Sequence, residues 1–375
     1  MSGHVRHLYV HVPFCAHRCG YCDFVTVVGR HGDHDRYVEA LLRELELERD
    51  VLADGVETVF LGGGTPTFLE PRALERLLRT LPPAAEVTVE ANPETVTPEL
   101  AALLPRSGAT RVSLGAQSFD PRLLDVLERG AGPEDVRRAF RLLREAGFDN
   151  ISLDLIYGIP GQSAAGLEHD LDEALALEPD HLSCYELEAK PGTRFTHAFG
   201  DELARQADAM EDYFERVVER LTGAGYRWYE TANFCRPGTP AGAPDYRSQH
   251  NLAYWHGRDY LGVGVGAVST IAGERRRNLP GLPRYVAALE RAATPPRETE
   301  QLDGETKRTE RVLLGLRLDE PLPLTGLEGA LDDAALRRLE RLGLARLDAE
   351  VDGRSLVLTP RGRFLGGGVT AELLA

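Results

Sequence analysis

A regular alternation of short β-branched segments with amphipathic helical segments most limits how this chain can fold. Strands are expected at Leu8–Val12, Val56–Leu61, Glu86–Glu90, Arg111–Leu114, Ile151–Ile156 and His181–Tyr185. Helices fit between them at Asp35–Asp50, Pro71–Thr80, Pro98–Pro105, Pro133–Ala146 and Ala164–Leu177. One β/α unit about every 30 residues predicts an α/β fold, whose parallel strands close into a full or partial (β/α) barrel of the TIM type.

Chemically unusual residues follow five of the expected strands. In chain order these features are the cysteines of residues 15–22, the turn Gly62-Gly63-Gly64-Thr65, Glu90, Gln117 and Asp154. A glycine triplet alone usually marks a tight turn, and a strand-end carboxylate usually caps a helix or lies at the surface. Active sites of β/α barrels gather at the C-terminal ends of the strands. Five such features in succession therefore predict one site at that end of the barrel.

The most specific motif is Cys-x3-Cys-x2-Cys, formed by Cys15, Cys19 and Cys22. Thiolates hold iron–sulfur clusters, and three of them can bind three irons of a [4Fe–4S] cubane and leave the fourth iron open. A zinc site usually has four ligands, and His11 or His17 could supply the fourth.

No second cysteine pair exists for a typical zinc motif, because Cys184 and Cys235 stand alone. The first residues also lack the apolar core of a signal peptide, which disfavours disulfides. We therefore expect a [4Fe–4S] cluster on the three-cysteine motif. The two isolated cysteines are expected to be small buried hydrophobic residues.

Length and charge narrow the class of protein. The 375 residues suffice for one large domain and a smaller one. The formal net charge of −16 disfavours non-specific binding to nucleic acid or to a membrane surface, because both are polyanions. No apolar run approaches the roughly 18 residues of a membrane span. We expect a cytoplasmic protein whose partners are small molecules or proteins.

The cysteine spacing closely resembles that of the radical S-adenosylmethionine (SAM) superfamily. Through nearly the whole chain, the sequence resembles the oxygen-independent coproporphyrinogen III oxidase-like branch of that superfamily. In this family SAM chelates the open iron and is cleaved by an electron from the cluster. The resemblance implies a SAM site lined by Tyr9, Gly63, Gly64, Thr65, Glu90, Gln117, Arg129 and Asp154, and we add Tyr21 of the cysteine motif as a cofactor-binding residue. Glu188 and Val268 match the family by position only.

These residue types suit the groups of SAM. A glycine turn lets the backbone meet the methionyl amino group or carboxylate. Arg129 can pair with a carboxylate through two hydrogen bonds, and Glu90 and Asp154 can accept from ribose hydroxyls or a protonated amine.

Two positions separate branches within the family. Phe24 stands where the oxidases carry a fourth cysteine, and the segment from His250 to Trp255 matches the signature His-Asn-x-x-Tyr-Trp of the family's heme chaperones. Both features favour a heme chaperone, which binds heme and transfers it to a target protein. One alternative is oxygen-independent coproporphyrinogen III dehydrogenase, which oxidises two propionate side chains. A second alternative is an iron–sulfur module without SAM chemistry.

The signature segment suggests where heme binds. Imidazole is a good axial ligand for heme iron, so His250 is a candidate, and Tyr254 with Trp255 offers flat apolar surface. A buried, hydrogen-bonded histidine is an equally good interpretation of His250, and His256 competes as the ligand. The glycines between Tyr260 and Ser269 should lie beside a ligand or another backbone.

The expected domains are a radical SAM barrel over 1–235, an extension over 236–298 and a C-terminal domain over 299–375. Ala292–Glu305 is expected to link two modules. Helices at Thr306–Leu318 and Asp332–Leu342, followed by a hairpin of Leu344–Leu347 and Ser355–Thr359 around Asp352-Gly353, predict a winged-helix-like α+β domain. The acidic chain disfavours DNA binding. Beyond heme and its acceptor protein, an electron donor such as flavodoxin or ferredoxin is an expected partner, and a homodimer is left open.

Overall fold

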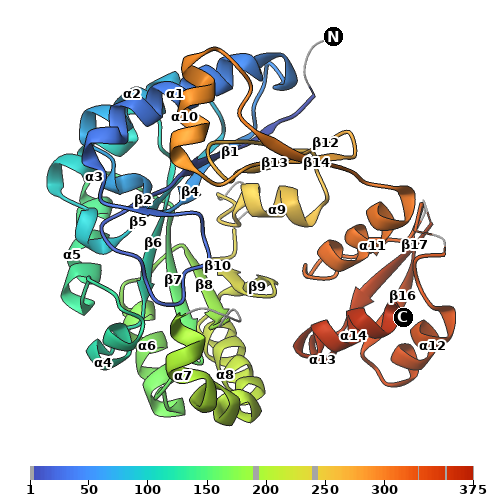
Figure 1. The fold of residues 1–375 in the computed structure, drawn as a ribbon. Helices are drawn as coiled ribbons and strands as arrows, with labels where there is room; N and C mark the ends of the chain where they lie inside the picture. Colours follow the sequence, from blue (N-terminus) through green and yellow to red (C-terminus); the bar gives the residue numbers. More distant parts are fainter. Residues whose placement is uncertain (1–3, 189–193, 239–243, 328, 351–352, 375) are drawn as a thin grey trace.

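The computed structural model describes residues 4–188, 194–238, 244–327, 329–350 and 353–374. Its centre is a nine-stranded sheet that curves into a partial barrel (Figure 1). The strands are β1 His7–Val12, β4 Thr58–Gly63, β5 Glu86–Ala91, β6 Arg111–Gln117, β7 Ile151–Tyr157, β8 His181–Glu186, β9 Arg227–Glu230, β10 Asn233–Cys235 and β11 Leu261–Val263. They lie in the order β11-β1-β4-β5-β6-β7-β8-β10-β9. Pairs from β11 to β8 are parallel, and β10 is antiparallel to β8 and β9. The predicted partial barrel is confirmed.

Helices cover the outside of this sheet (Figure 1). They are α1 His34–Leu47, α2 Pro71–Thr80, α3 Pro98–Arg106, α4 Pro121–Val126, α5 Pro133–Glu145, α6 Ala164–Ala176, α7 Arg194–Gln206 and α8 Met210–Gly223. Four of them, α2 to α5, begin at a proline, whose fixed φ suits the first helical turn and whose missing N–H would be unpaired there anyway. The apolar faces of these helices and of the strands form one continuous core.

Residues 236–298 do more than extend the barrel, because β11 pairs with β1 on the side opposite β4 and is part of the barrel sheet. Gly262 and Gly264 on this segment have no room for a side chain: a Cβ on Gly262 would lie 2.1 Å from Val268 O, and one on Gly264 2.7 Å from His11 O. The glycine-rich run therefore lies against other backbone, one of the two expected placements. The barrel proper is completed by residues beyond the predicted boundary at 235.

The segment predicted to be a linker carries a strand. A three-stranded antiparallel sheet consists of β12 Val268–Ile271, β13 Glu274–Asn278 and β14 Arg297–Gln301, with α10 Leu282–Glu290 between the last two strands. The expected domain boundary at 298 falls inside β14, so the prediction of a linker over Ala292–Glu305 is wrong. The β13–β14 pairs oppose arginine with glutamate at Arg275–Glu300 and Arg277–Glu298, which stabilises strands that have little apolar surface.

Glu44 fastens this extension to α1. Its side chain is fully buried and accepts hydrogen bonds from Gly264 N at 2.7 Å, Asn278 Nδ2 at 2.7 Å and Tyr285 Oη at 2.6 Å. Arg297 Nη2 lies 2.9 Å from the same carboxylate. A buried charge requires such partners, so these contacts fix how the extension sits on the barrel.

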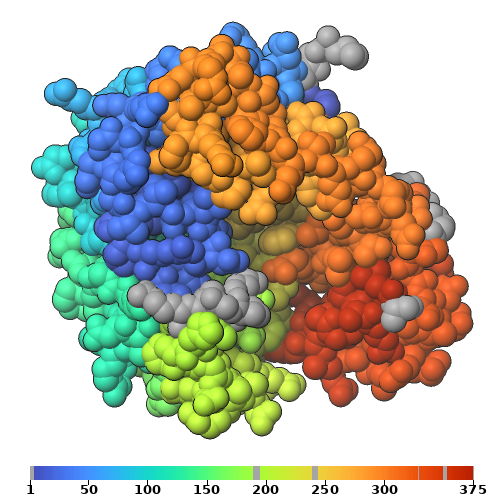
Figure 2. Space-filling view, viewed as in Figure 1, coloured from blue at the N-terminus to red at the C-terminus, as the bar shows by residue number. Residues whose placement is uncertain are grey.

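The C-terminal residues form an α+β lobe beside the barrel, red in Figure 2. It contains α11 Gly304–Gly315, β15 Leu322–Pro323, α12 Asp333–Arg341, β16 Ala345–Glu350, β17 Gly353–Leu358, α13 Pro360–Phe364 and α14 Gly366–Leu373. The strands pair antiparallel in the order β15-β17-β16, and the lobe has its own apolar core. The two expected helices and the hairpin are confirmed; Asp352 lies outside the described residues.

Arg363 of α13 joins this lobe to the barrel. Its guanidinium carbon lies 3.7 Å from the ring centroid of Trp228 in β9, and its Nη1 donates to Trp228 O at 2.9 Å. Arg227 and Asp319 form a second contact between the same parts, through two hydrogen bonds of 2.8 and 2.9 Å. Within the described residues, no helix is both long and apolar enough to cross a membrane.

Candidate functional site

A cavity of about 540 Å³ opens at the C-terminal ends of the parallel strands. It brings together eleven of the residues predicted from the sequence: Cys15, Cys19, Tyr21, Cys22, Gly63, Gly64, Thr65, Glu90, Gln117, Arg129 and Asp154. Glu188 also lines it, whereas Val268 lies in β12, away from this lining. The fold therefore brings residues as far apart in the chain as Cys15 and Asp154, 139 positions, to the lining of one cavity.

The three motif cysteines lie on one loop at the mouth of this cavity. Cys15 ends the short strand β2 Phe14–Cys15, which pairs with β3 Val27–Val28, so the loop is closed by backbone pairing at its base. Cys22 N donates to Cys19 O at 3.2 Å and tightens the loop. All three thiols are free and partly exposed, while Cys184 and Cys235 are buried.

The surroundings of the loop disfavour ionisation of two of its thiols, those of Cys15 and Cys22. Burial raises the pKa of Cys15 to about 11, and the neighbouring Cys22 and Cys19 contribute in the same direction against a hydrogen bond from Thr65. Burial also raises the pKa of Cys22. Thiols with raised pKa values need a strongly positive partner to become thiolates, and bound iron would supply that charge.

The glycine turn after β4 packs too closely for side chains. Gly63 has φ +109°, and a Cβ there would lie 2.3 Å from His11 Cε1. A Cβ on Gly64 would lie 2.7 Å from Pro13 C. Only glycine fits at both positions, and the turn consequently presents bare backbone to the cavity.

Two carboxylates face the cavity below this turn. Burial and the charge of Asp154 raise the pKa of Glu90 to about 7, although Gly63 N donates to Glu90 Oε2 at 3.0 Å. Burial raises the pKa of Asp154 too, while hydroxyl donors such as Ser113 Oγ, 3.0 Å from Asp154 Oδ2, act in the opposite direction. A pair of buried carboxylates favours a ligand that carries positive charge.

Arg129 offers the opposite charge on the other side of the cysteine loop. Its Nη2 donates to Asn92 Oδ1 and to Gly115 O, both at 2.9 Å, and its Nη1 lies 3.7 Å from Cys19 Sγ. Arg129 Nε is buried and has no partner among the described residues. A guanidinium fixed in this way keeps a donor for a ligand carboxylate.

Gln117 reaches the site through a strained backbone. It has φ +66°, and the β6–β7 register shifts between Gly115 and Gln117. A non-glycine residue with positive φ is uncommon and costs free energy, and such irregularities cluster at functional sites. The bulge turns the end of β6 toward the cavity.

Polar lining residues that the sequence analysis did not predict as part of the site include Asn92, Arg111 and Asn251. Asn92 directly follows β5, and its Nδ2 donates to Thr65 Oγ1 at 3.0 Å, so its strand-end position was a usable signal. Arg111 is only 2 % exposed and interacts electrostatically with Glu90 and Asp154; a lone cation opening an apolar strand was the signal there. Asn251 follows His250 in the signature segment, and this position was the signal in its case.

Tyr9 and His250 do not line the cavity; both lie in the barrel interior near Phe60. Tyr9 Oη lies 3.0 Å from His11 Nδ1, and its ring stacks on Phe60. His250 is fully buried in α9 Gln249–Trp255, with Nδ1 2.8 Å from Thr58 Oγ1 and Nε2 2.8 Å from Tyr254 Oη. Both ring nitrogens are thus already hydrogen-bonded. Burial lowers the pKa of His250 to about 3, which keeps the ring neutral.

Comparison with known proteins agrees with this geometry. Residues 9–174 match the family model of the radical SAM superfamily. The heme chaperone HemW of Mycobacterium tuberculosis is 40% identical over 386 residues, covering 100% of this chain and 96% of the relative. HemW of Escherichia coli is 41% identical over 270 residues, or 69% of this chain and 68% of the relative.

A solved structure shares the fold. Coproporphyrinogen III oxidase (HemN) from Escherichia coli, a radical SAM enzyme, superposes with a TM-score of 0.80 at 24% identity, over 100% of this chain and 91% of that one. The fold and the cysteine-bearing cavity define a radical SAM protein. Within that class, the chain belongs to the HemW family of heme chaperones.

The described residues fit the cofactors of the class. Three free thiols gathered on one loop beside the cavity suit a [4Fe–4S] cluster with one open iron. The bare glycine turn, the buried carboxylates and the free Nε of Arg129 suit the amino acid and ribose parts of SAM. Bound there, the cluster and SAM supply one-electron chemistry. The chain's own residues position the two groups beside one another.

Proposed function

We propose that this protein is a heme chaperone that binds a [4Fe–4S] cluster through Cys15, Cys19 and Cys22, binds SAM in the adjoining cavity, and transfers heme to target proteins. The observation that carries the proposal is the convergence of the cluster loop with Glu90, Gln117, Arg129 and Asp154 in one cavity. The similarity to HemW over the full chain supports heme as the cargo.

Phe24 weighs against the oxidase alternative. Its side chain is 63 % exposed and lies on the cavity lining, at the position where the oxidases have a further cysteine. An apolar ring at the mouth of the cavity cannot replace a thiol in ligation or proton transfer. The likeness to HemN is one of fold.

Several finer features belong to the same proposal. We propose a cytoplasmic location, where thiols stay reduced, and an electron donor of the flavodoxin or ferredoxin type. We propose that the acceptor of heme is a protein. We also propose a division into a barrel, an extension and a C-terminal domain, with β11 of the extension belonging to the barrel sheet and the boundary to the C-terminal domain placed after β14.

The test is to offer the anaerobically reconstituted protein heme and coproporphyrinogen III separately. We expect stoichiometric heme binding, seen as a Soret band that co-elutes with the protein. We also expect no carbon dioxide release from coproporphyrinogen III with SAM and a reductant. Formation of protoporphyrinogen IX at catalytic levels would overturn the chaperone proposal and establish the dehydrogenase.

A further inference from the structure

A chain of hydrogen bonds runs from Asp154 into the closed interior of the barrel. Asp154 lines the cavity of about 540 Å³ at the strand ends, which we call the SAM cavity. Ser152 Oγ donates to Asp154 Oδ1 at 3.3 Å and lies 2.8 Å from His181 Nδ1. His181 Nε2 in turn lies 2.8 Å from Tyr229 Oη. Ser152, His181 and Tyr229 are fully buried and do not line the SAM cavity, so the chain reaches that cavity at Asp154.

The far end of the chain lies at the start of α9, the helix that carries the signature segment. Tyr229 Oη accepts a hydrogen bond from Ser248 N at 3.1 Å. Ser248 is the N-cap residue of α9, and its Oγ accepts from Asn251 N at 3.4 Å. Asn251 itself lines the SAM cavity. The signature helix is therefore connected to that cavity twice, directly through Asn251 and through the hydrogen-bond chain that ends at Asp154.

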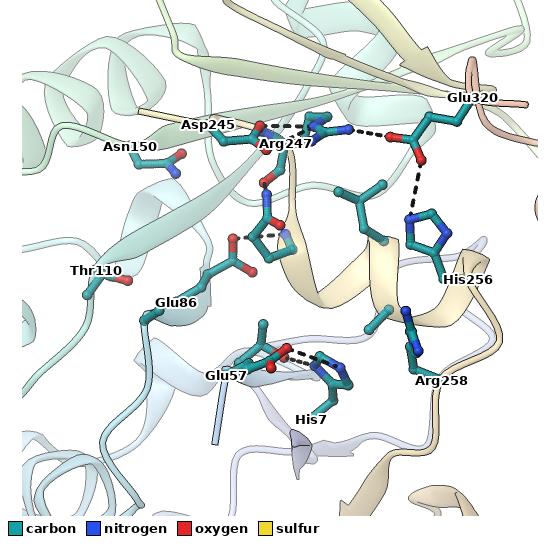
Figure 3. A pocket seen from close by; sticks show the side chains of 15 residues that line it. His7, Glu57, Glu86, Thr110, Asn150, Asp245, Arg247, His256, Arg258 and Glu320 are labelled. Atoms are coloured by element: carbon teal, nitrogen blue, oxygen red, sulfur yellow. Dashed lines mark hydrogen bonds and ion pairs between the residues drawn. The ribbon is translucent and has the colours of Figure 1, made fainter. Parts of the chain in front are cut away.

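The start of α9 is held in place from its other side (Figure 3). The carboxylate of Glu86 accepts hydrogen bonds from Gln249 N and His250 N, both at 3.0 Å. Glu86 and Gln249 border a second cavity, of about 550 Å³, near the N-terminal ends of the strands. Because the backbone is fixed there, the N–H group of Ser248 keeps its direction toward Tyr229.

The hydrogen-bond donors of the chain all point toward Asp154. Burial and the charge of Arg111 lower the pKa of His181 well below its usual value, so the ring is neutral and only one nitrogen carries a proton. The single hydroxyl proton of Ser152 goes to the carboxylate, so His181 Nδ1–H must donate to Ser152, and His181 Nε2 must accept from Tyr229. In the reverse order the phenol proton would have no acceptor among the described residues.

The carboxylate of Asp154 depends on such donors. Burial raises the pKa of Asp154, and Glu90 faces it with a charge of the same sign. The charge of Arg111 and three serine hydroxyls, including that of Ser152, act in the opposite direction. A buried carboxylate keeps its charge when it accepts several hydrogen bonds. Turning the hydroxyl of Ser152 away would therefore favour the neutral acid.

We propose that His181 and Tyr229 are positioning residues of the SAM site, which act through Ser152 to keep the carboxylate of Asp154 oriented and charged for the ligand. This inference rests on the proposed function, since it concerns the site assigned there to SAM. Neither side chain lines the cavity, so its effect on SAM requires the carboxylate at the end of the chain.

The test measures the Kd of SAM by equilibrium dialysis with full-length, cluster-reconstituted protein. Tyr229→Phe removes one oxygen atom and should raise the Kd about three- to tenfold, the usual effect of a lost hydrogen bond. In an Asp154→Asn background the same substitution should leave the Kd unchanged, because the carboxylate is already gone. Tyr226→Phe is the matched control: Tyr226 is buried, and its Oη donates to Pro179 O at 2.6 Å, outside the chain.

Two further positions test the chain without the phenol. His181→Ala removes the donor to Ser152 and should weaken SAM binding about as much as Tyr229→Phe does. His181→Asn places an amide N–H where Nδ1–H stood and should recover most of the affinity, a rescue that a merely space-filling role does not predict. Ser152→Ala also breaks the chain with the loss of one oxygen atom. Cluster absorbance and circular dichroism show which variants are folded.

Wild-type affinity in folded Tyr229→Phe, His181→Ala and Ser152→Ala would overturn the inference. An equal rise of the Kd with and without Asp154→Asn would also overturn it, because the effect would then not pass through the carboxylate. Either result leaves SAM binding by the wild type, and with it the proposed function, intact. If the reconstituted wild type does not bind SAM, the SAM part of the proposed function fails together with this inference.

Discussion

Arg129 Nη1 lies 3.7 Å from Cys19 Sγ, so the cation expected to hold the SAM carboxylate also touches a cluster cysteine. The same guanidinium is anchored by Asn92 Oδ1 and Gly115 O at the ends of β5 and β6. One side chain thus connects the loop of the three motif cysteines with the strand ends that line the cavity.

Two substitutions of Arg129 distinguish the contribution of its charge to SAM affinity from the contribution of its forked hydrogen-bonding geometry. Arg129→Ala should weaken SAM binding by about 1–3 kcal/mol, since it removes a charge-assisted hydrogen bond. Arg129→Lys keeps the charge but cannot make the forked contacts to Asn92 and Gly115, so it should recover only part of the affinity. Equilibrium dialysis with reconstituted protein measures both. SAM affinity equal to wild type in the alanine variant would remove Arg129 from the site.

The ligand set of the cluster can be tested by serine substitution. Each of Cys15→Ser, Cys19→Ser and Cys22→Ser should abolish the brown [4Fe–4S] chromophore, because three thiolates are the fewest that hold a cubane with one free iron. Cys184→Ser and Cys235→Ser are matched controls at buried cysteines and should keep full iron and sulfide content. Loss of the cluster in a control variant would mean that the motif is not the whole ligand set.

From the raised pKa of Glu90 we expect that SAM binding releases a proton. Its pKa of about 7 means that the carboxyl is largely protonated at pH 6, and a cationic ligand would favour its ionised form. SAM affinity should therefore rise from pH 6 to pH 8. Calorimetry in two buffers of different ionisation enthalpy should detect up to one proton released near pH 6. Glu90→Gln should abolish both effects, and a wild type with pH-independent SAM affinity would contradict the prediction.

From the lowered pKa of His250 we expect the free energy of unfolding to depend on pH. Its folded-state pKa of about 3 lies below that of an exposed histidine, so between these values the unfolded chain binds a proton that the folded chain does not. Its contribution to stability is complete above about pH 6.5 and declines as the pH falls toward 3. In denaturant titrations, His250→Gln should lower the slope of unfolding free energy against pH by up to about 1.4 kcal/mol per pH unit. Equal slopes for the wild type and His250→Gln would contradict the prediction.

The contacts of Arg363 with Trp228 are expected to help hold the C-terminal lobe against the barrel. Arg363→Ala removes the contact with the Trp228 ring and the hydrogen bond to Trp228 O, which should cost about 1–3 kcal/mol. We expect a lower unfolding temperature and faster proteolysis between barrel and lobe. Arg361→Ala, an exposed arginine of the same helix, is the control. Equal protease resistance in both variants would show that the lobe is held by other contacts.

The hydrophobic pattern of the sequence predicted the barrel but did not predict the sheet formed by β12, β13 and β14. The bounds of α2 agree with the expected Pro71–Thr80 because leucines recur on one face of that helix. Strand β13 is instead rich in arginine and β14 rich in glutamate, so neither shows apolar alternation. These strands are stabilised by charge pairs across the ladder, which become visible only once the register is known.

The cysteine loop and the polar residues at the strand ends could be predicted, because each is recognised from residues that are close together in the sequence. The environment of His250 could not, since Thr58 lies 192 residues away and only tertiary structure brings the two side chains together. The second cavity of the structure, lined among others by His7, Glu86 and Arg247, could not be predicted for the same reason. Its lining combines the start of the chain with residues near 250 and 320.

The pairing of β1 with β11 has a consequence for how the protein matures in the cell. The strand that leads into the cysteine loop remains an open edge until Leu261–Val263 has been synthesised and docked. The loop's exit is also covered late, because Gly266 packs against Val25, with its Cβ position 2.7 Å from Val25 Cγ2. A ribosome-bound chain therefore exposes the three thiols without their final enclosure. Iron–sulfur loading is expected to follow the release of most of the chain from the ribosome.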